Sequence, residues 1–206
     1  MKFIRGLLVI YHRYRSGIEA RRKNGKIEKH IESQVINMIV IDAGHGGRDS
    51  GASHGDLEEK TPALSIALML AGLLEAAGKN VFLTRDTDEF ISLQRRSELA
   101  NKANAHIFIS IHHNGHTDVS ANGIETYHYP GSDKGQEYAQ SIQQSLVDNL
   151  NLRNRGVKQA TFSVLKYTRA PAVLLEIGFI SNKEEREKLK NCDFLFKAAK
   201  SIKEVL

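Results

Sequence analysis

The chain has a single cysteine, Cys192, among its 206 residues. One cysteine excludes a disulfide framework and a zinc site built from several thiolates, so any metal site must use histidine and carboxylate side chains. The sequence also lacks a run of about 18 apolar residues, the length needed to span a membrane. Internal repeats and low-complexity tracts are absent. Because 41% of the residues are hydrophobic and 26% are charged, the composition is that of one globular domain with an ordinary core.

Positive charge is unevenly distributed along the chain. Residues 1–36 hold nine Lys or Arg residues against three Glu residues, and the rest of the chain is close to neutral. A folded part without a basic face argues against nucleic-acid binding. The basic segment is better suited to contact with an anionic cell wall or membrane surface. We therefore predict a basic N-terminal segment or linker over residues 1–36 and a folded domain over residues 37–206.

The first eleven residues begin like a signal peptide, with positive charge followed by apolar residues. However, Arg5 interrupts the apolar run and residues 12–15 (His-Arg-Tyr-Arg) close it. No small-residue cleavage pattern follows, so the sequence leaves the route of export open.

From residue 37 onward, short apolar runs alternate with stretches that have apolar residues at helical spacing. The predicted helices cover residues 61–77, 92–104, 134–150, 183–190 and 194–205. Strands are predicted at residues 39–41, 80–84, 106–111, 123–129 and 172–175, with a further short strand at 162–167. Such alternation indicates a sheet built by crossover connections. We predict an α/β fold: a single domain with a central, mostly parallel sheet flanked by helices on both faces.

Three of the predicted strands run directly into a residue that can bind a metal or transfer a proton: His45, His112 and Glu176. The carboxyl ends of strands are where open α/β sheets place their sites. Glycines on both sides of His45 allow close approach of a metal or substrate to the imidazole. Taken alone, His45 could be a turn histidine and His112 a core histidine. Glu176 carries the clearest signal, because a carboxylate after three apolar strand residues is costly to bury without an ionic partner or a metal.

Glu59 is a further candidate because it lies just before the first predicted helix. Taken alone, it is a carboxylate favoured by the helix dipole. If His45, Glu59 and His112 bind one ion, they leave a fourth position open, which is the ligand count of a catalytic zinc site. Glu176 would then be the acid–base residue.

The sequence does not assign one role to two further residues, His113 and Arg85. His113 is expected to point to the face of the sheet opposite His112 if strand alternation continues. Arg85, at the end of a strand, either orients a carboxylate of the site or of a peptide, or is a plain surface arginine.

Six motifs occur in a fixed order over residues 38–206. They are residues 42–47 (Asp-Ala-Gly-His-Gly-Gly), 59–60 (Glu-Lys), 83–85 (Leu-Thr-Arg), 110–114 (Ser-Ile-His-His-Asn), 123–127 (Gly-Ile-Glu-Thr-Tyr) and 175–182 (Leu-Glu-Ile-Gly-Phe-Ile-Ser-Asn). Together they resemble the zinc-dependent N-acetylmuramoyl-L-alanine amidases of the type-3 amidase family. The resemblance implies one zinc ion per chain held by His45, Glu59 and His112, with Glu176 as the catalytic carboxylate. It also implies that residues 37–206 are a zinc amidase catalytic domain that cleaves the amide between N-acetylmuramic acid and the L-alanine of the peptidoglycan stem.

Peptidoglycan is therefore the expected partner, and the expected place of action is extracytoplasmic, at the cell wall, with the chain as a monomer. The alternative is a zinc hydrolase of another amide, such as a peptidase or deacetylase. A wall-binding module without catalysis is disfavoured because all four site residues are present. The sequence does not distinguish a bacterial autolysin from a phage endolysin. His113 stands where many relatives carry a small residue, which leaves the stem-peptide preference open.

Overall fold

The structure is a computed structural model of the whole chain, and it describes residues 37–206. The predicted basic segment, residues 1–36, lies outside the described residues. The elements in chain order are β1 (Met38–Ala43), β2 (Ser53–His54), β3 (Leu57–Glu58), α2 (Lys60–Ala76), β4 (Asn80–Leu83), α3 (Leu93–Lys102), β5 (Ala105–Asn114), β6 (Ile124–His128), α4 (Asp133–Leu150), β7 (Asn154–Gln159), α5 (Ser163–Tyr167), β8 (Ala172–Phe179), α6 (Lys183–Lys190) and α7 (Cys192–Lys203).

Six strands form one central sheet in the order β4-β1-β5-β8-β6-β7. The strands β4, β1, β5 and β8 are parallel to one another, whereas β6 runs antiparallel to β8 and parallel to β7. The predicted mostly parallel sheet is thus confirmed. Because β6 and β7 run the opposite way, they begin at the edge of the sheet where β1, β5 and β8 end.

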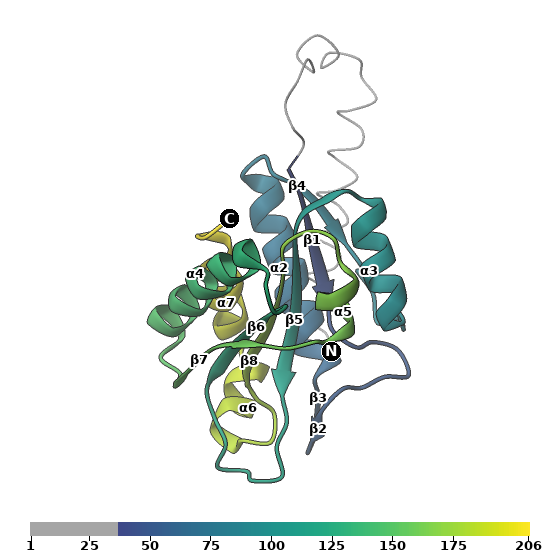
Figure 1. Cartoon of the computed structure of the whole chain (residues 1–206). Coiled ribbons are helices and arrows are strands. Elements are labelled where there is room, and N and C mark those ends of the chain that lie inside the picture. The colour runs from purple at the N-terminus through teal and green to yellow at the C-terminus, as the bar shows by residue number, and fades with distance from the viewer. Residues whose placement is uncertain (1–36) are drawn as a thin grey trace.

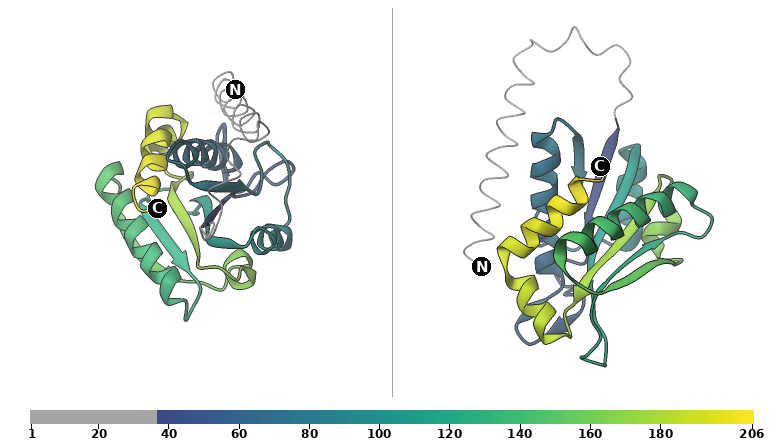
Figure 2. Two further views of the ribbon diagram at one scale, coloured as in Figure 1. Left: turned by 90° about the horizontal axis from the view of Figure 1, so that it is seen from above. Right: turned by 90° about the vertical axis from the view of Figure 1, so that its left-hand side faces the viewer.

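Helices cover both faces of this sheet, as predicted (Figures 1 and 2). The helices α2, α4 and α7 pack on one face, and the smaller pair α3 and α5 packs on the other. Each face of the sheet has its own apolar core, and side chains alternate between the two faces along β5. Ile107, Ile109 and Ile111 belong to the larger core under α2, α4 and α7, and Phe108 belongs to the smaller core under α3 and α5. No helix within residues 37–206 combines the length and apolar character needed to cross a membrane.

The prediction of a strand at residues 162–167 was wrong, because this segment is the short helix α5. Val164 and Leu165 are both buried in the smaller core, beneath the α3–α5 layer. A strand would have sent these adjacent side chains to opposite faces, whereas a helical turn directs both toward the sheet.

Two further differences concern strands β7 and β8. The edge strand β7 was not predicted, because Val157 is its only apolar residue and the other five are Asn, Arg, Gly, Lys and Gln. Strand β8 continues to Phe179, beyond the predicted end at residue 175, so Glu176 lies inside the strand and not after it.

Candidate metal and catalytic site

The chain turns sharply after β1, and glycines make room for the histidine that follows. His45 itself has a φ of 57°, in the left-handed region. A Cβ at Gly44 would lie 2.4 Å from Cε1 of His112. A Cβ at Gly51, where φ is +67°, would lie 2.5 Å from Oε2 of Glu59. These two positions therefore require glycine, because a side chain at either one would collide with His112 or Glu59.

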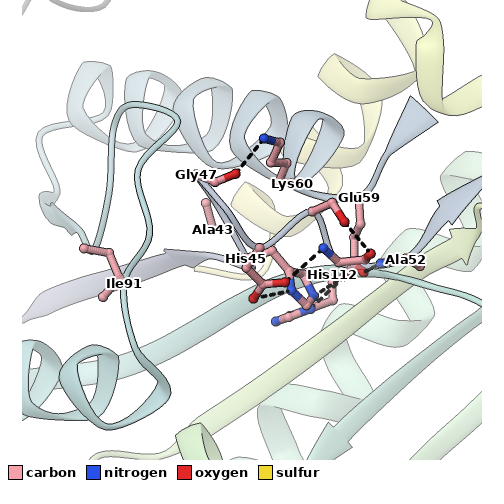
Figure 3. Close-up of polar contacts among 12 residues, drawn as sticks. Ala43, His45, Gly47, Ala52, Glu59, Lys60, Ile91 and His112 are labelled. Carbon is pink, nitrogen blue, oxygen red and sulfur yellow. Dashed lines mark hydrogen bonds and ion pairs between the residues drawn. The ribbon is translucent and has the colours of Figure 1, made fainter. Parts of the chain in front are cut away.

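The structure brings His45, Glu59 and His112 together at the carboxyl edge of the sheet (Figure 3). Oε1 of Glu59 lies 3.1 Å from Nε2 of His45 and 2.8 Å from Nδ1 of His112. One ligand atom from each residue lies within 4.8 Å of the others. Ligand distances of 2.0–2.2 Å around tetrahedral zinc correspond to spacings of about 3.3 Å between the ligands themselves. Two imidazole nitrogens and one carboxylate oxygen at these spacings fit a single zinc ion.

Residues outside the cluster hold two of these side chains, His45 and Glu59, by hydrogen bonds. Nδ1 of His45 lies 3.0 Å from Oδ2 of Asp49, as expected for a metal-binding histidine whose second N–H is donated to a carboxylate. The backbone N–H of Ala52 donates to Oε2 of Glu59 at 2.8 Å. The cluster is therefore oriented by the loop and strand around it and not by its own contacts alone.

The charges in this cluster push the pKa values of its members apart. Burial raises the pKa of Glu59, but hydrogen bonds from His112 and His45 outweigh burial and hold that pKa well below its ordinary value. Burial also disfavours the charged form of His45, yet its contacts with Glu59 and Asp49 raise its pKa overall. Glu59 is therefore an ionised carboxylate, the form that binds a metal.

Glu176 lies next to this cluster on the neighbouring strand. It is the register partner of His112 in the parallel pairing of β5 with β8, so both side chains project from the same face of the sheet. Its Oε2 atom is inaccessible to solvent and has no hydrogen-bond partner among residues 37–206. Burial, followed by repulsion from Glu59 and Glu125, raises its pKa well above the ordinary value. Glu176 thus stands beside the three clustered residues without being hydrogen bonded to them.

Arg85 has neither of the two roles predicted for it. Its side chain is buried and donates to the carbonyl oxygens of Ala43 at 2.9 Å and Gly44 at 2.7 Å. It also reaches the carbonyl oxygen of Lys60 at the start of α2. Arg85 therefore fixes the backbone that carries His45, instead of orienting a carboxylate or lying on the surface.

Arg96 in α3 makes similar contacts and was missed in the sequence. Its guanidinium donates to the carbonyl oxygens of Ala43 and His45 at 2.6 and 2.7 Å, and to Oδ1 of the buried Asp42 at 2.7 Å. Leu93, an apolar residue at the start of this helix, is 58% exposed. The available signal was the position of Arg96 on the same helical face as Ala100, where a charged residue interrupts the apolar stripe.

His113 is not part of the cluster of His45, Glu59 and His112. Its side chain is buried, and Nδ1 donates to the carbonyl oxygen of Ile177 at 2.7 Å. Burial lowers its pKa to about 4, so the ring stays neutral at physiological pH. Only its backbone N–H reaches the cluster, donating to Oε1 of Glu59 at 3.1 Å.

Comparison with known proteins places this site in a family. The family model described as N-acetylmuramoyl-L-alanine amidase matches residues 39–206. The chain is 41% identical over 181 residues to the N-acetylmuramoyl-L-alanine amidase LytC of Bacillus subtilis (strain 168), in an alignment that covers 86% of this chain and 36% of LytC. This chain therefore spans about a third of the length of that relative.

Solved structures of N-acetylmuramoyl-L-alanine amidases have the same fold as this chain. The catalytic domain of CwlV, an N-acetylmuramoyl-L-alanine amidase from Bacillus (Paenibacillus) polymyxa var. colistinus, superimposes with a TM-score of 0.79 at 35% identity, covering 82% of this chain and 95% of that one. The N-acetylmuramoyl-L-alanine amidase from Clostridium difficile 630 gives a TM-score of 0.81 at 33% identity, covering 84% and 95% of the two chains. The match over residues 39–206 and the shared fold show that this chain belongs to the type-3 family of N-acetylmuramoyl-L-alanine amidases.

Proposed function

We propose that this chain is a zinc-dependent amidase that hydrolyses the bond between N-acetylmuramic acid and the L-alanine of the peptidoglycan stem. The observation that carries the proposal is the convergence of two imidazole nitrogens on one carboxylate oxygen. Beside them, in register, is a buried glutamate with one oxygen that has no hydrogen-bond partner within residues 37–206. Membership of the amidase family supports the choice of substrate.

His45, Glu59 and His112 would hold one zinc ion per chain. Two histidines and one carboxylate are a donor set that suits zinc, and three protein ligands are the number found in catalytic sites. When bound, zinc would act as a Lewis acid that polarises the carbonyl group of the scissile amide and lowers the pKa of the attacking water. Asp49 keeps the His45 ring in the orientation that this binding requires.

Glu176 is the residue we assign to proton transfer. Its carboxylate accepts a proton from the attacking water and later delivers it to the nitrogen of the leaving L-alanine, which is a poor leaving group without that proton. A nearby divalent cation favours the ionised form of Glu176 and thereby opposes the effect of burial on its pKa. Among residues 37–206, Oε2 has no hydrogen-bond partner, so no other described group competes for the proton that it carries.

The test is digestion of purified sacculi by the zinc-loaded protein, with the Glu176→Gln variant as the matched control. The expected products are stem peptides with free L-alanine amino termini, with no release of reducing sugar. Free amino termini on other residues would point to a peptidase, and release of acetate would point to a deacetylase. Either outcome would contradict the proposal.

The substrate also sets the proposed place of action. Peptidoglycan lies outside the cytoplasmic membrane, so we place the activity there, with peptidoglycan as the partner and no role for nucleic acid. The nine Lys or Arg residues within residues 1–36 support a contact between this segment and an anionic wall or membrane surface. We further propose that the chain acts as a monomer, which sedimentation of the full-length protein would test.

A further inference from the structure

A second charged group lies on the same face of the sheet, next to Glu176. Glu125 of β6 is the register partner of Glu176 in the antiparallel pairing of β6 with β8. Paired residues project from the same face and lie about 5 Å apart. Oε2 of Glu125 accepts hydrogen bonds from Nε of Arg155 at 2.9 Å and from Nζ of Lys158, both on β7.

Arg155 and Lys158, the β7 cation pair, carry more charge than Glu125 neutralises. The side chain of Glu125 is only 4% exposed, whereas those of Arg155 and Lys158 are 28% and 39% exposed. One carboxylate balances one of the two cations. The pair therefore exceeds Glu125 by one positive charge, and its two cations are the more exposed members of the group. Glu185 also lies within electrostatic range of Arg155, so Lys158 is the cation with the fewer competing carboxylates.

The cation pair also has hydrogen-bond donors to spare. Arginine has five N–H donors and lysine has three. Within the described part of the chain, Arg155 uses Nε toward Glu125 and Nη1 toward the carbonyl oxygen of Asn122, and Lys158 bonds only to Glu125. Several charged donors therefore remain for a ligand.

Aromatic rings hold both cations in position. The guanidinium of Arg155 lies 4.9 Å from the ring centroid of Phe179, and Nζ of Lys158 lies 5.8 Å from that of Tyr127. Contact with a ring face reduces the freedom of these long side chains before a ligand binds. A ligand would then lose less conformational entropy on binding them.

The distance from Glu176 matches a short extended peptide. Neighbouring strands lie about 4.8 Å apart, and β7 is two strands from β8, so the backbone that carries the cation pair is about 10 Å from that of Glu176 across the sheet. The charged groups themselves reach back to Glu125 on the strand between them. An extended peptide advances about 3.5 Å per residue. With the scissile amide beside Glu176, a chain crossing the sheet presents its second or third residue to the cation pair.

We propose that Arg155 and Lys158 form a subsite that binds a free carboxylate on the second or third residue of the stem peptide. This proposal rests on the proposed amidase function and assigns the substrate feature that the enzyme selects. Charge-assisted, paired donors of this kind suit a carboxylate and discriminate against the neutral amide of the same shape.

The test compares three muramoyl tripeptides: one with both carboxylates free, one amidated at the second residue, and one amidated at the third. We expect one of the two amidations to lower kcat/KM of the wild-type enzyme about tenfold, as loss of one charge-assisted hydrogen bond would do. That amidation identifies the residue bound. In the Lys158→Gln variant, the ratio between the free and amidated substrates should fall toward one. Lys134→Gln, at an exposed position on α4, is the matched control and should keep the wild-type ratio.

Each other outcome gives a definite answer. If the wild-type enzyme cleaves all three substrates equally well, the subsite is wrong and the amidase function stands. If Lys158→Gln lowers kcat/KM by the same factor for all three, the cation pair only neutralises Glu125, and the subsite is again wrong. If the zinc-loaded wild type cleaves none of them, both the subsite and the proposed function are overturned.

Discussion

Glu59 and Glu176 are two carboxylates of one site, and their surroundings are opposite. Glu59 accepts hydrogen bonds at both oxygens, with His45 and His112 near Oε1 and the N–H of Ala52 at Oε2. Glu176 has one oxygen that is buried and unpartnered among the described residues. The pKa of Glu59 is held low and that of Glu176 is raised.

The contrast shows how the fold can give two identical side chains different tasks. An ionised carboxylate with hydrogen-bond partners at both oxygens is suited to hold a metal, because its position and charge are fixed. A carboxylate whose charge is opposed by burial is suited to carry a proton, since both of its forms are accessible. Environments that push two pKa values apart in this way are a general means of separating roles in active sites.

The largest expected effect comes from removing a metal ligand. Replacing His45 or His112 with Ala should remove most of the bound zinc and reduce activity to background, because two ligands hold the ion far more weakly than three. Zinc per chain and turnover are the measurements. His54→Ala, at an exposed histidine outside the cluster, is the control and should retain both. Undiminished zinc and full activity in either ligand variant would refute the ligand assignment.

The next largest effect concerns the support beneath His45. Arg96→Met leaves the buried carboxylate of Asp42 without its ion-pair partner, and breaking such a pair costs about 3–5 kcal/mol. Urea unfolding measures the loss. The adjacent Arg95 is 54% exposed, so Arg95→Met should change stability by less than about 0.5 kcal/mol. Equal effects of the two substitutions would show that Arg96 does not support the loop.

A smaller effect is the pH dependence of the metal-free protein. The pKa of Glu59 lies below its ordinary 4.5, so its contribution to stability is present above that pH and is lost as pH falls. The pKa of His45 lies above its ordinary 6.5, so its contribution is present below 6.5 and is lost as pH rises through the folded-state pKa.

For this pair of residues, the metal-free protein should therefore be most stable between about pH 4.5 and 6.5. Urea unfolding after chelation at several pH values tests this, with His45→Ala as the control that should lose the decline above pH 6.5. Zinc should move the optimum upward, because the metal competes with protons for histidine. A metal-free protein that gains stability between pH 6 and 8 would contradict the assignment.

The smallest expected effect is that of removing residues 1–36. A protein beginning at Asn37 should fold and cleave soluble muropeptides at the rate of the full chain, since every proposed site residue lies beyond that point. Binding to intact walls should weaken, because the positive excess is removed. Failure of the shortened protein to fold would place the domain boundary earlier in the chain.

The elements and residues that could be predicted were those with local signals. Apolar runs and helical spacing identified β1, α2, β5 and α4, because burial imposes these periods on the sequence. The ends of three strands pointed to His45, His112 and Glu176, and the structure brings these residues to one edge. Glu59 was a candidate from its position before the first helix, but a glutamate there has an adequate local explanation, so the family resemblance was needed to favour the ligand role.

The parts that could not be predicted depend on contacts distant in the sequence. Arg96 and Asp42 are 54 residues apart, and nothing near either one shows that they form a buried pair. The same holds for Arg85, whose partners are backbone carbonyls of another loop. Strand β7 lies at the edge of the sheet, so its mostly polar sequence carries little of the pattern that burial on two faces would impose.

The contrast between the two carboxylates is tested most directly by measuring zinc content and turnover in Glu59→Gln and Glu176→Gln side by side. We predict that Glu59→Gln loses most of its zinc, because a neutral amide is a weaker ligand. Glu176→Gln should keep its zinc and lose about 100- to 10,000-fold in turnover, the range typical of general acid–base catalysis. If Glu176→Gln instead loses zinc in step with activity while Glu59→Gln retains it, the roles are reversed and the account is wrong.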